Sequence, residues 1–171
     1  MTADSARVGV LFVCHANICR SPLAEGVFTE LVHARGLDDK FVIDSAGTWA
    51  DGGHAPHPFS IEIAAKHNID LRRLRSRSVE PEDLHRFDHI LAMDRANLAD
   101  LERLRRISAF GPVQGGKAKI RLFRHVADPR AQGPAADVAD PVRLGIDAYT
   151  STYALLVAAS NALLDEILGP T

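Results

Sequence analysis

The chain has 171 residues, of which 46% are hydrophobic and 25% are charged. These proportions are typical of one globular domain of about 100–200 residues, and they exclude a disordered tail or a small disulfide-stapled scaffold. Twenty basic and twenty-two acidic residues leave a formal net charge of −2. This balance argues against a protein that neutralises a long nucleic-acid backbone. We expect a single domain over residues 1–171, with residues 1–6 as a flexible N-terminal segment.

Neither an export signal nor a membrane span is expected. The longest apolar run, residues 8–14, is far shorter than the roughly 20 residues that cross a bilayer, and residues 1–6 lack a signal-peptide pattern. The two cysteines, Cys14 and Cys19, are too few for a disulfide framework and lack the partners of a zinc module. We therefore expect a cytoplasmic protein with no membrane or nucleic-acid partner, whose cysteines serve chemistry.

The predicted elements alternate between strands and helices. Residues 8–13 form a continuous apolar run with β-branched residues, as in a strand covered on both faces. Pro22 can open a helix whose apolar residues recur at helical spacing until Gly36 ends it. The alternation continues with a strand at 41–44, a helix at 61–67, a strand at 88–92, a helix at 97–104, a strand at 120–123 and a last helix at 148–168.

This alternation predicts an α/β fold of the doubly wound type, in which a mostly parallel sheet carries helices on both faces. Three segments rich in loop-forming residues connect the elements, at 45–58, 111–117 and 128–145. Ligands bind such sheets at the carboxyl ends of the strands. We therefore expect the functional site in loops that leave this edge, the first and third of these segments among them.

Directly after the first strand the sequence reads Cys14-His-Ala-Asn-Ile-Cys-Arg20-Ser21-Pro22. Successive backbone N–H groups in a loop that enters a helix can form an anion site, and the helix dipole adds positive potential. Arg20 can bind two phosphate oxygens with its planar fork. The same field favours the Cys14 thiolate, which predicts a nucleophile for phosphoryl transfer through a cysteinyl-phosphate intermediate.

This segment resembles the active-site loop of the low-molecular-weight protein-tyrosine phosphatases, whose signature is V-C-x-G-N-x-C-R-S-P. The resemblance continues through Asp44-Ser-Ala-Gly-Thr48, Phe87-Asp-His-Ile-Leu-Ala-Met-Asp94 and Asp140-Pro141, so it covers nearly the whole chain. It implies a four-stranded parallel twisted sheet with the phosphate-binding loop after the first strand. It also implies hydrolysis of phosphotyrosine and other aryl phosphomonoesters without metal or cofactor, with phosphotyrosine-containing proteins as partners and phosphate or related oxyanions as inhibitors.

The resemblance also assigns roles within the loop. It makes Cys14 the nucleophile, Arg20 the phosphate clamp, Ser21 the hydroxyl that steadies the thiolate, and Asn17 the residue that holds the loop's shape. Cys19 corresponds to a cysteine that can form a protective disulfide with the nucleophile, although it can equally be an inert wall residue. The remaining members of the predicted phosphate-binding loop are His15, Ala16 and Ile18.

Cleaving a phosphomonoester also requires a proton for the leaving oxygen, a role suited to a carboxylic acid. Two Asp-Pro pairs compete for this role, at Asp128 and Asp140. Asp140 lies before the last helix, where the family has its general acid, and we favour it. Asp94 also matches a family position, but it could simply cap the helix that follows it.

Three positions around the loop depart from the family pattern. His15 replaces a usually apolar residue, and we expect it at the mouth of the site. Ala16 replaces the usual glycine, so the loop must adopt a conformation that tolerates a Cβ. Leu74 stands where many members have a histidine that bonds to the loop, and we expect Asn17, Ser21 and Ser45 to hold the loop without it.

The predicted substrate slot also differs. Val142 and Arg143 replace two aromatic residues, and Trp49 is either an aromatic wall of the slot or a partly buried residue without that role. The Asp-Pro-x-Arg sequence resembles the bacterial branch associated with exopolysaccharide export, which suggests an autophosphorylating bacterial tyrosine kinase as substrate. Arg75 and Arg77 lie in a basic run that is either a solvated surface or a rim that attracts acidic substrates.

Two other functions compete with this interpretation. An arsenate reductase shares the loop and fold in some bacteria, but its disulfide relay uses distal cysteines, and none follows Cys19. A non-catalytic phosphate-binding module would keep the anion site without the chemistry. The joint presence of Cys14, Arg20 and an Asp-Pro acid argues against such a module.

Overall fold

The computed structural model describes residues 7–110 and 116–170. Within them, four strands form one parallel sheet in the order β2-β1-β3-β4. The strands are β1 (Val8–Cys14), β2 (Phe41–Gly47), β3 (His89–Ala92) and β4 (Lys119–Leu122). The predicted α/β fold with a four-stranded parallel sheet is confirmed. The N-terminal segment predicted to be flexible and most of the predicted loop at 111–117 lie outside the described residues.

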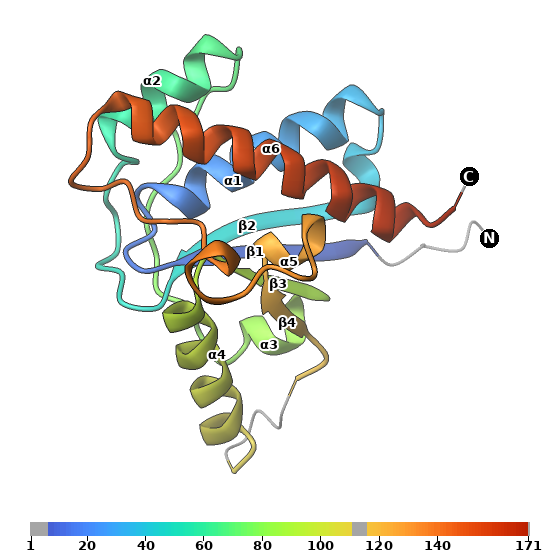
Figure 1. The fold of residues 1–171 in the computed structure, drawn as a ribbon. Coiled ribbons are helices and arrows are strands. Elements are labelled where there is room, and N and C mark those ends of the chain that lie inside the picture. Colours follow the sequence, from blue (N-terminus) through green and yellow to red (C-terminus); the bar gives the residue numbers. More distant parts are fainter. Residues whose placement is uncertain (1–6, 111–115, 171) are drawn as a thin grey trace.

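Helices cover both faces of this sheet (Figure 1). α1 and α6 pack together on one face with α2 beside them, whereas α3 and α4 lie on the other. The helices are α1 (Arg20–Ala34), α2 (Pro58–Lys66), α3 (Asp83–Arg86), α4 (Arg95–Ser108), α5 (Arg124–Ala127) and α6 (Ile146–Leu168), with short 3-10 turns at Asp38–Lys40 and Gly133–Ala136. Within the described part of the chain, every helix is too short or insufficiently apolar to span a bilayer.

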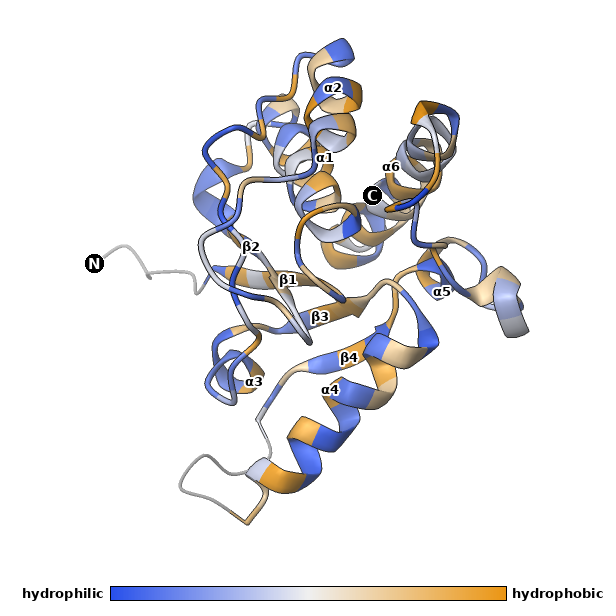
Figure 2. Ribbon diagram, turned by 90° about the vertical axis from the view of Figure 1, so that its left-hand side faces the viewer, coloured by the Kyte–Doolittle hydropathy of each residue, from blue (hydrophilic) through white to orange (hydrophobic). Residues whose placement is uncertain are grey.

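The central strand β1 is buried on both sides. Val10 and Phe12 belong to the apolar cluster beneath α1 and α6, whereas Leu11 and Val13 belong to the cluster beneath α3 and α4. Figure 2 shows hydrophobic residues along β1 and a mixture of hydrophilic and hydrophobic residues along α4. A parallel strand covered on both faces needs apolar side chains at consecutive positions, which explains the unbroken apolar run in the sequence.

The structure shifts several predicted boundaries. α1 begins at Arg20 instead of Pro22, because Cys19 takes the N-cap position. β2 continues to Gly47 beyond its predicted end at residue 44, since its last residues still pair with β1. α3 and α5, of four residues each, were not predicted, because a single helical turn has no apolar periodicity to detect.

The parallel arrangement gathers loops at the carboxyl edge of the sheet. The N–H of Thr48 donates to the carbonyl of Cys14 at 2.9 Å, which joins the end of β2 to the loop after β1. The N–H of Met93 donates to Val13 at 2.9 Å, and Val138 in turn donates to Met93 at 2.7 Å. These bonds bring the segment that precedes α6 beside the loop that follows β1.

Candidate active site

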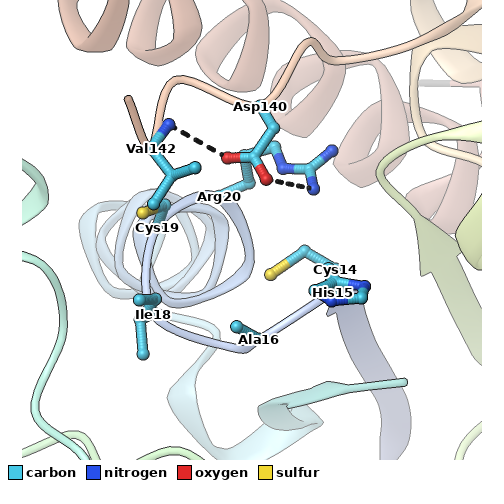
Figure 3. Close-up of a pocket in the computed structure, with 8 residues that line it drawn as sticks. All are labelled: Cys14, His15, Ala16, Ile18, Cys19, Arg20, Asp140 and Val142. Atoms are coloured by element: carbon cyan, nitrogen blue, oxygen red, sulfur yellow. Dashed lines mark hydrogen bonds and ion pairs between the residues drawn. The ribbon is translucent and has the colours of Figure 1, made fainter. Parts of the chain in front are cut away.

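The loop that connects β1 to α1 borders a pocket of about 110 Å³ (Figure 3). The pocket is lined by Cys14, His15, Ala16, Ile18, Cys19, Arg20, Asp140 and Val142. The last two come from the segment before α6, and the others come from the loop. The structure therefore brings the predicted phosphate-binding loop and one of the two competing acids to the same pocket.

The backbone of the loop is free to bind a ligand. The N–H groups of residues 15–19 donate no hydrogen bond to the chain, as far as the structure describes it. They precede α1, whose first turn carries no acidic side chain. Consecutive unbonded N–H groups at the positive end of a helix attract an anion. The loop thus offers a site for an anion such as a phosphate group.

Asn17 shapes this loop from a buried position. Its φ of 56° lies in the left-handed region, which asparagine adopts more readily than most residues. Its side-chain nitrogen donates to the hydroxyl oxygens of Ser21 at 2.8 Å and Ser45 at 3.0 Å. Its Oδ1 accepts the backbone N–H of Arg77 at 3.0 Å. These contacts are those expected of a residue that holds the loop in one conformation.

Gly47 allows the end of β2 to approach the loop. A Cβ there would lie 2.5 Å from the carbonyl oxygen of His15 and 3.0 Å from the backbone nitrogen of Asn17. Because backbone atoms cannot easily move aside, only glycine fits. Ala16 differs, since Asn17 and Asn68 are the only non-glycine residues with positive φ in the described ranges. Its methyl group therefore adds no backbone strain where the family has glycine.

Arg20 is held on one side and open on the other. It is 2% exposed, and its Nη1 donates to Asp94 at 2.7 Å and to the carbonyl of Val138 at 2.9 Å. Its Nη2 lies 3.3 Å from the Asp140 carboxylate. Its Nε is buried with no hydrogen-bond partner among the described residues. Nε and Nη2 form the guanidinium edge that binds an oxyanion in a bidentate manner.

The charge of Arg20 is secure despite its burial. Burial alone lowers the pKa of an arginine, but the negative charges of Cys14, Asp94 and Asp140 outweigh it and raise the pKa of Arg20. Arg20 is therefore protonated at neutral pH.

Asp94 links Arg20 to helix α4. One of its oxygens accepts the N–H of Asn97 at 2.8 Å, and the other accepts from Arg20 at 2.7 Å. The side chain of Asn97 accepts the N–H of Asp94 at 3.2 Å, which completes a capping box. Asp94 thus caps α4 and also holds the arginine. An aspartate two residues after β3, at the carboxyl edge of the sheet, was the sequence signal for this second role.

The two cysteines occupy different environments. The Cys14 sulfur lies 2.9 Å from the hydroxyl of Ser21, whereas the Cys19 sulfur lies 3.3 Å from the hydroxyl of Tyr149. Burial raises the pKa of Cys19 to about 11, since the bond from Tyr149 offsets only part of it and the charges of Asp140 and Cys14 raise it further. Cys19 is therefore a neutral thiol at neutral pH. Cys14 is the candidate nucleophile.

The structure separates the two competing acids. Asp140 lies at the pocket, where its Oδ2 is 3.3 Å from Arg20 and its Oδ1 accepts the N–H of Val142 at 3.1 Å (Figure 3). Its side chain is 40% exposed, so water and substrate can reach it. Asp128 is exposed elsewhere and accepts the N–H of Arg130 at 3.3 Å. The geometry favours Asp140 as the acid.

Comparison with known proteins identifies the family. A family model described as low molecular weight phosphotyrosine protein phosphatase matches residues 9–169. The chain belongs to this family. A Schizosaccharomyces pombe protein named low molecular weight phosphotyrosine protein phosphatase is 39% identical over 162 residues, which cover 94% of this chain and 97% of the relative. The resemblance inferred from the active-site loop, and with it the class of enzyme, is confirmed.

Solved structures of similar proteins have the same fold. The crystal structure of YfkJ from Bacillus subtilis matches with a TM-score of 0.79 and 32% identity, covering 95% of this chain and 96% of that one. The structure of DARP, a Drosophila arginine phosphatase, matches with a TM-score of 0.81 and 28% identity, covering 95% and 99%. The shared fold therefore includes proteins named for different phosphorylated side chains.

The predicted substrate slot is only partly assembled. Val142 lines the same pocket as Cys14 and lies next to Cys19 (Figure 3). Trp49, by contrast, is 65% exposed and borders a separate pocket over α4, where its indole N–H donates to Asp100 at 3.0 Å. This bond holds the ring against α4, so the expectation that Trp49 forms a wall of the slot is corrected. Arg143 is exposed and does not line the pocket either.

The structure also places the basic run and Leu74, which stands where many family members have a histidine. Arg77 points inward and pairs with Asp44 at 3.0 Å and Asp83 at 2.9 Å, so it does not form a rim for acidic substrates. Arg75 is exposed. Leu74 is half-buried against the apolar core, and a leucine offers the loop no hydrogen bond.

Sequence reasoning alone did not identify two residues that contact the loop, Glu25 and Tyr149. Glu25 accepts a hydrogen bond from the Ser45 hydroxyl at 2.5 Å. It lies one helical turn after Ser21 on α1, and this spacing was a signal that could have found it. Tyr149 reaches Cys19 from α6, 130 positions along the chain. No local sequence pattern predicts that contact.

Replacing Cys19 tests the assignment of the two cysteines. We expect Cys19→Ala to lower kcat by less than about tenfold, because a buried neutral thiol is chemically inert. Steady-state hydrolysis of an aryl phosphate measures this effect. A loss in Cys19→Ala as large as that in Cys14→Ser would contradict the assignment.

The buried carboxyl of Glu25 should make stability depend on pH. Burial raises the pKa of Glu25 from 4.5 to about 7, and the nearby charge of Asp44 acts in the same direction. The folded state thus binds this proton more tightly than the unfolded state, so the stabilisation is complete below the unfolded pKa and is lost as the pH rises through the folded one. Between about pH 5 and about pH 8, the free energy of unfolding of the wild type should fall relative to that of Glu25→Gln by on the order of 1–3 kcal/mol. Urea denaturation at each pH measures this difference. A difference that is independent of pH would refute the raised pKa.

Proposed function

We propose that the protein hydrolyses phosphotyrosine in proteins, and aryl phosphomonoesters in general, through a cysteinyl-phosphate intermediate. One observation carries this proposal: a free thiol at Cys14 shares a pocket with unbonded N–H groups and with the open edge of Arg20. The donors would bind the three non-bridging oxygens of a phosphate group. The bound phosphorus would then face the sulfur that attacks it.

In the first step, the Cys14 thiolate attacks phosphorus in line with the leaving oxygen. The S–P bond forms and the P–O bond to the aryl group breaks, while Arg20 and the loop N–H groups stabilise the charge on the non-bridging oxygens. Asp140 gives its proton to the leaving oxygen. Ser21, whose hydroxyl lies 2.9 Å from the sulfur, stabilises the thiolate before the attack.

In the second step, the deprotonated Asp140 accepts a proton from water as the water oxygen attacks the phosphocysteine. The S–P bond breaks, the thiolate returns to Cys14 and inorganic phosphate leaves. Because Asp140 ends this step protonated, it is ready to donate again. Ile18 and Val142 supply apolar surface at the pocket, which suits the aromatic ring of the leaving group.

The same proposal includes location and partners. A catalytic thiolate with a second free thiol nearby suits the reducing cytoplasm. The partners would be phosphotyrosine-containing proteins, with a tyrosine kinase that phosphorylates itself as one candidate. Inorganic phosphate and related oxyanions would compete for the loop.

The test compares one peptide with its phosphate on tyrosine, on serine or on arginine, in excess chelator. We expect release of phosphate from phosphotyrosine in the presence of the chelator, with competitive inhibition by added inorganic phosphate. The arginine substrate is included because DARP is named an arginine phosphatase. Faster release from phosphoarginine would reassign the substrate, and no release from any of the three would refute the proposal.

A further inference from the structure

A chain of hydrogen bonds connects the sulfur of Cys14 to a carboxylate on the far side of the loop. Cys14 lies 2.9 Å from the hydroxyl of Ser21, which accepts from the Asn17 amide at 2.8 Å. The same amide donates to Ser45 at 3.0 Å, and Ser45 donates to Glu25 at 2.5 Å. Asn17, Ser21 and Ser45 are at most 4% exposed, so water does not compete for these bonds.

The direction of each bond follows from the chemistry of Asn17. Its Oδ1 accepts the backbone N–H of Arg77, which fixes which side of the amide carries the nitrogen. Both hydrogens of that nitrogen are then donated to the two serine oxygens. Each serine hydrogen must find another acceptor. For Ser45 this acceptor is Glu25. For Ser21 two acceptors lie in reach, the Cys14 sulfur at 2.9 Å and the more distant Ala46 carbonyl oxygen at 3.4 Å, and a charged thiolate is the stronger of the two.

Glu25 has no other strong partner. In the ranges that the structure describes, no arginine or lysine forms an ion pair with it, and it shares a pocket with Leu71 and Leu74. Charged groups of the neighbouring segments are Asp44 on β2, Asp70 after α2, Arg77 before α3 and Glu30 on its own helix. Arg77 is already paired with Asp44 and Asp83. The contact with Ser45 is therefore the main polar role left to Glu25.

We propose that Glu25 is a positioning residue for the phosphatase reaction: by accepting the Ser45 hydrogen, it keeps Asn17 and Ser21 oriented so that Ser21 donates to the Cys14 thiolate. This inference rests on the proposed function, because it assigns the support of the nucleophile. Without the acceptor, the buried Ser45 hydrogen has no partner, and the arrangement that directs Ser21 toward the sulfur loses its anchor.

The test replaces the acceptor in two ways. Glu25→Leu removes it, whereas Glu25→Gln keeps an oxygen that can accept from Ser45. For an aryl phosphate, we expect Glu25→Leu to lower kcat about tenfold with little change in KM, and Glu25→Gln to retain most of the wild-type kcat. Glu30→Leu is the matched control on the same helix, since Glu30 is exposed and, among the described residues, forms no hydrogen bond with Asn17, Ser21 or Ser45.

A second readout reports on the thiolate itself. The rate of iodoacetamide alkylation between about pH 6 and about pH 8, assigned to Cys14 by peptide mass mapping, follows the thiolate fraction. We expect Glu25→Leu to slow this reaction and Glu30→Leu to leave it unchanged. Above the pKa of about 7, where Glu25 is charged, loss of this charge alone would instead speed alkylation, because a nearby negative charge disfavours the thiolate. The sign of the change therefore separates positioning from simple electrostatics.

The route through Ser45 is tested with a double variant. If Glu25 acts only through Ser45, the variant with both Glu25→Leu and Ser45→Ala should be no slower than the slower single variant. Circular dichroism and thermal melting of every variant identify a loss of kcat that comes from unfolding.

The pH profile of kcat adds a check. Burial raises the pKa of Glu25 to about 7, so the ratio of the wild-type kcat to that of Glu25→Gln should grow as the pH rises through this value.

Three results would overturn the inference. The first is an unchanged kcat and alkylation rate in folded Glu25→Leu, and the second is faster alkylation in that variant. The third is a double variant whose fold reduction in kcat equals the product of the reductions in the two single variants. A wild-type protein that fails to hydrolyse the aryl phosphate would refute the proposed function instead. The two failures are thus distinguishable.

Discussion

Cys14→Ser should lower kcat for an aryl phosphate by about 10⁴-fold or more. The serine hydroxyl would occupy the same place beside Ser21, at the end of β1, but a neutral hydroxyl is a poor nucleophile at neutral pH. Cys19 cannot substitute for it, because burial raises its pKa to about 11. Initial rates with p-nitrophenyl phosphate in excess chelator measure the effect.

Binding should survive this substitution, which provides its control. The N–H groups of residues 15–19 and the Arg20 guanidinium do not depend on the sulfur. Added inorganic phosphate should therefore raise the melting temperature of Cys14→Ser as it does that of the wild type. Undiminished turnover in the serine variant would contradict the assignment of the nucleophile. Loss of the phosphate-induced shift would show that the variant no longer forms the loop.

Asp140→Asn should lower kcat by about 10²–10⁴-fold, the usual contribution of a general acid and base. The amide keeps the size of the side chain and can still accept the N–H of Val142, but it cannot give a proton to the leaving oxygen. The loss should be larger for phenyl phosphate than for p-nitrophenyl phosphate, because the nitrophenolate needs less protonation to leave. Steady-state kinetics with both substrates measure this dependence on the leaving group.

Asp128→Asn is the matched control for this prediction. Both aspartates precede a proline, but Asp128 is exposed and does not line the pocket. Its replacement should leave kcat within about twofold, as for most surface substitutions away from a site. A larger loss in Asp128→Asn than in Asp140→Asn would reverse the assignment of the acid.

The sheet was predictable because its signals are local and redundant. The apolar run of β1 and the helical spacing in α1 each indicate one element, and their alternation limits the connections to a parallel sheet. The ends of the elements were less predictable. β2 extends to Gly47 because its last residues still pair with β1, and such pairing cannot be inferred from β2 alone.

The centre of the site was predictable for a similar reason. Cys14, Asn17, Arg20 and Ser21 lie in one short segment, so their proximity does not depend on the rest of the fold. Asp140 required knowledge of the family, since the residues alone left Asp128 as a competitor. The structure supports this choice by placing Asp140 beside Arg20.

The surroundings of the site were harder to foresee. Trp49 follows a segment that matches the family pattern, but its indole bonds to Asp100 on α4 and it lines a different pocket. Glu25 on α1 accepts a hydrogen bond from Ser45 on β2, a contact with the loop network that Leu74 cannot make. Such contacts join side chains that are distant in the sequence, so the periodicity of apolar residues does not predict them.

The most direct test of the account is to trap the covalent intermediate. Asp140→Asn, which lacks the base for hydrolysis, should accumulate it when mixed with p-nitrophenyl phosphate and quenched in acid. Intact mass and peptide mapping should then find one added phosphoryl group, attached to Cys14. A phosphoryl group on another residue, or rapid turnover with no phosphoenzyme at any time after mixing, would contradict the account.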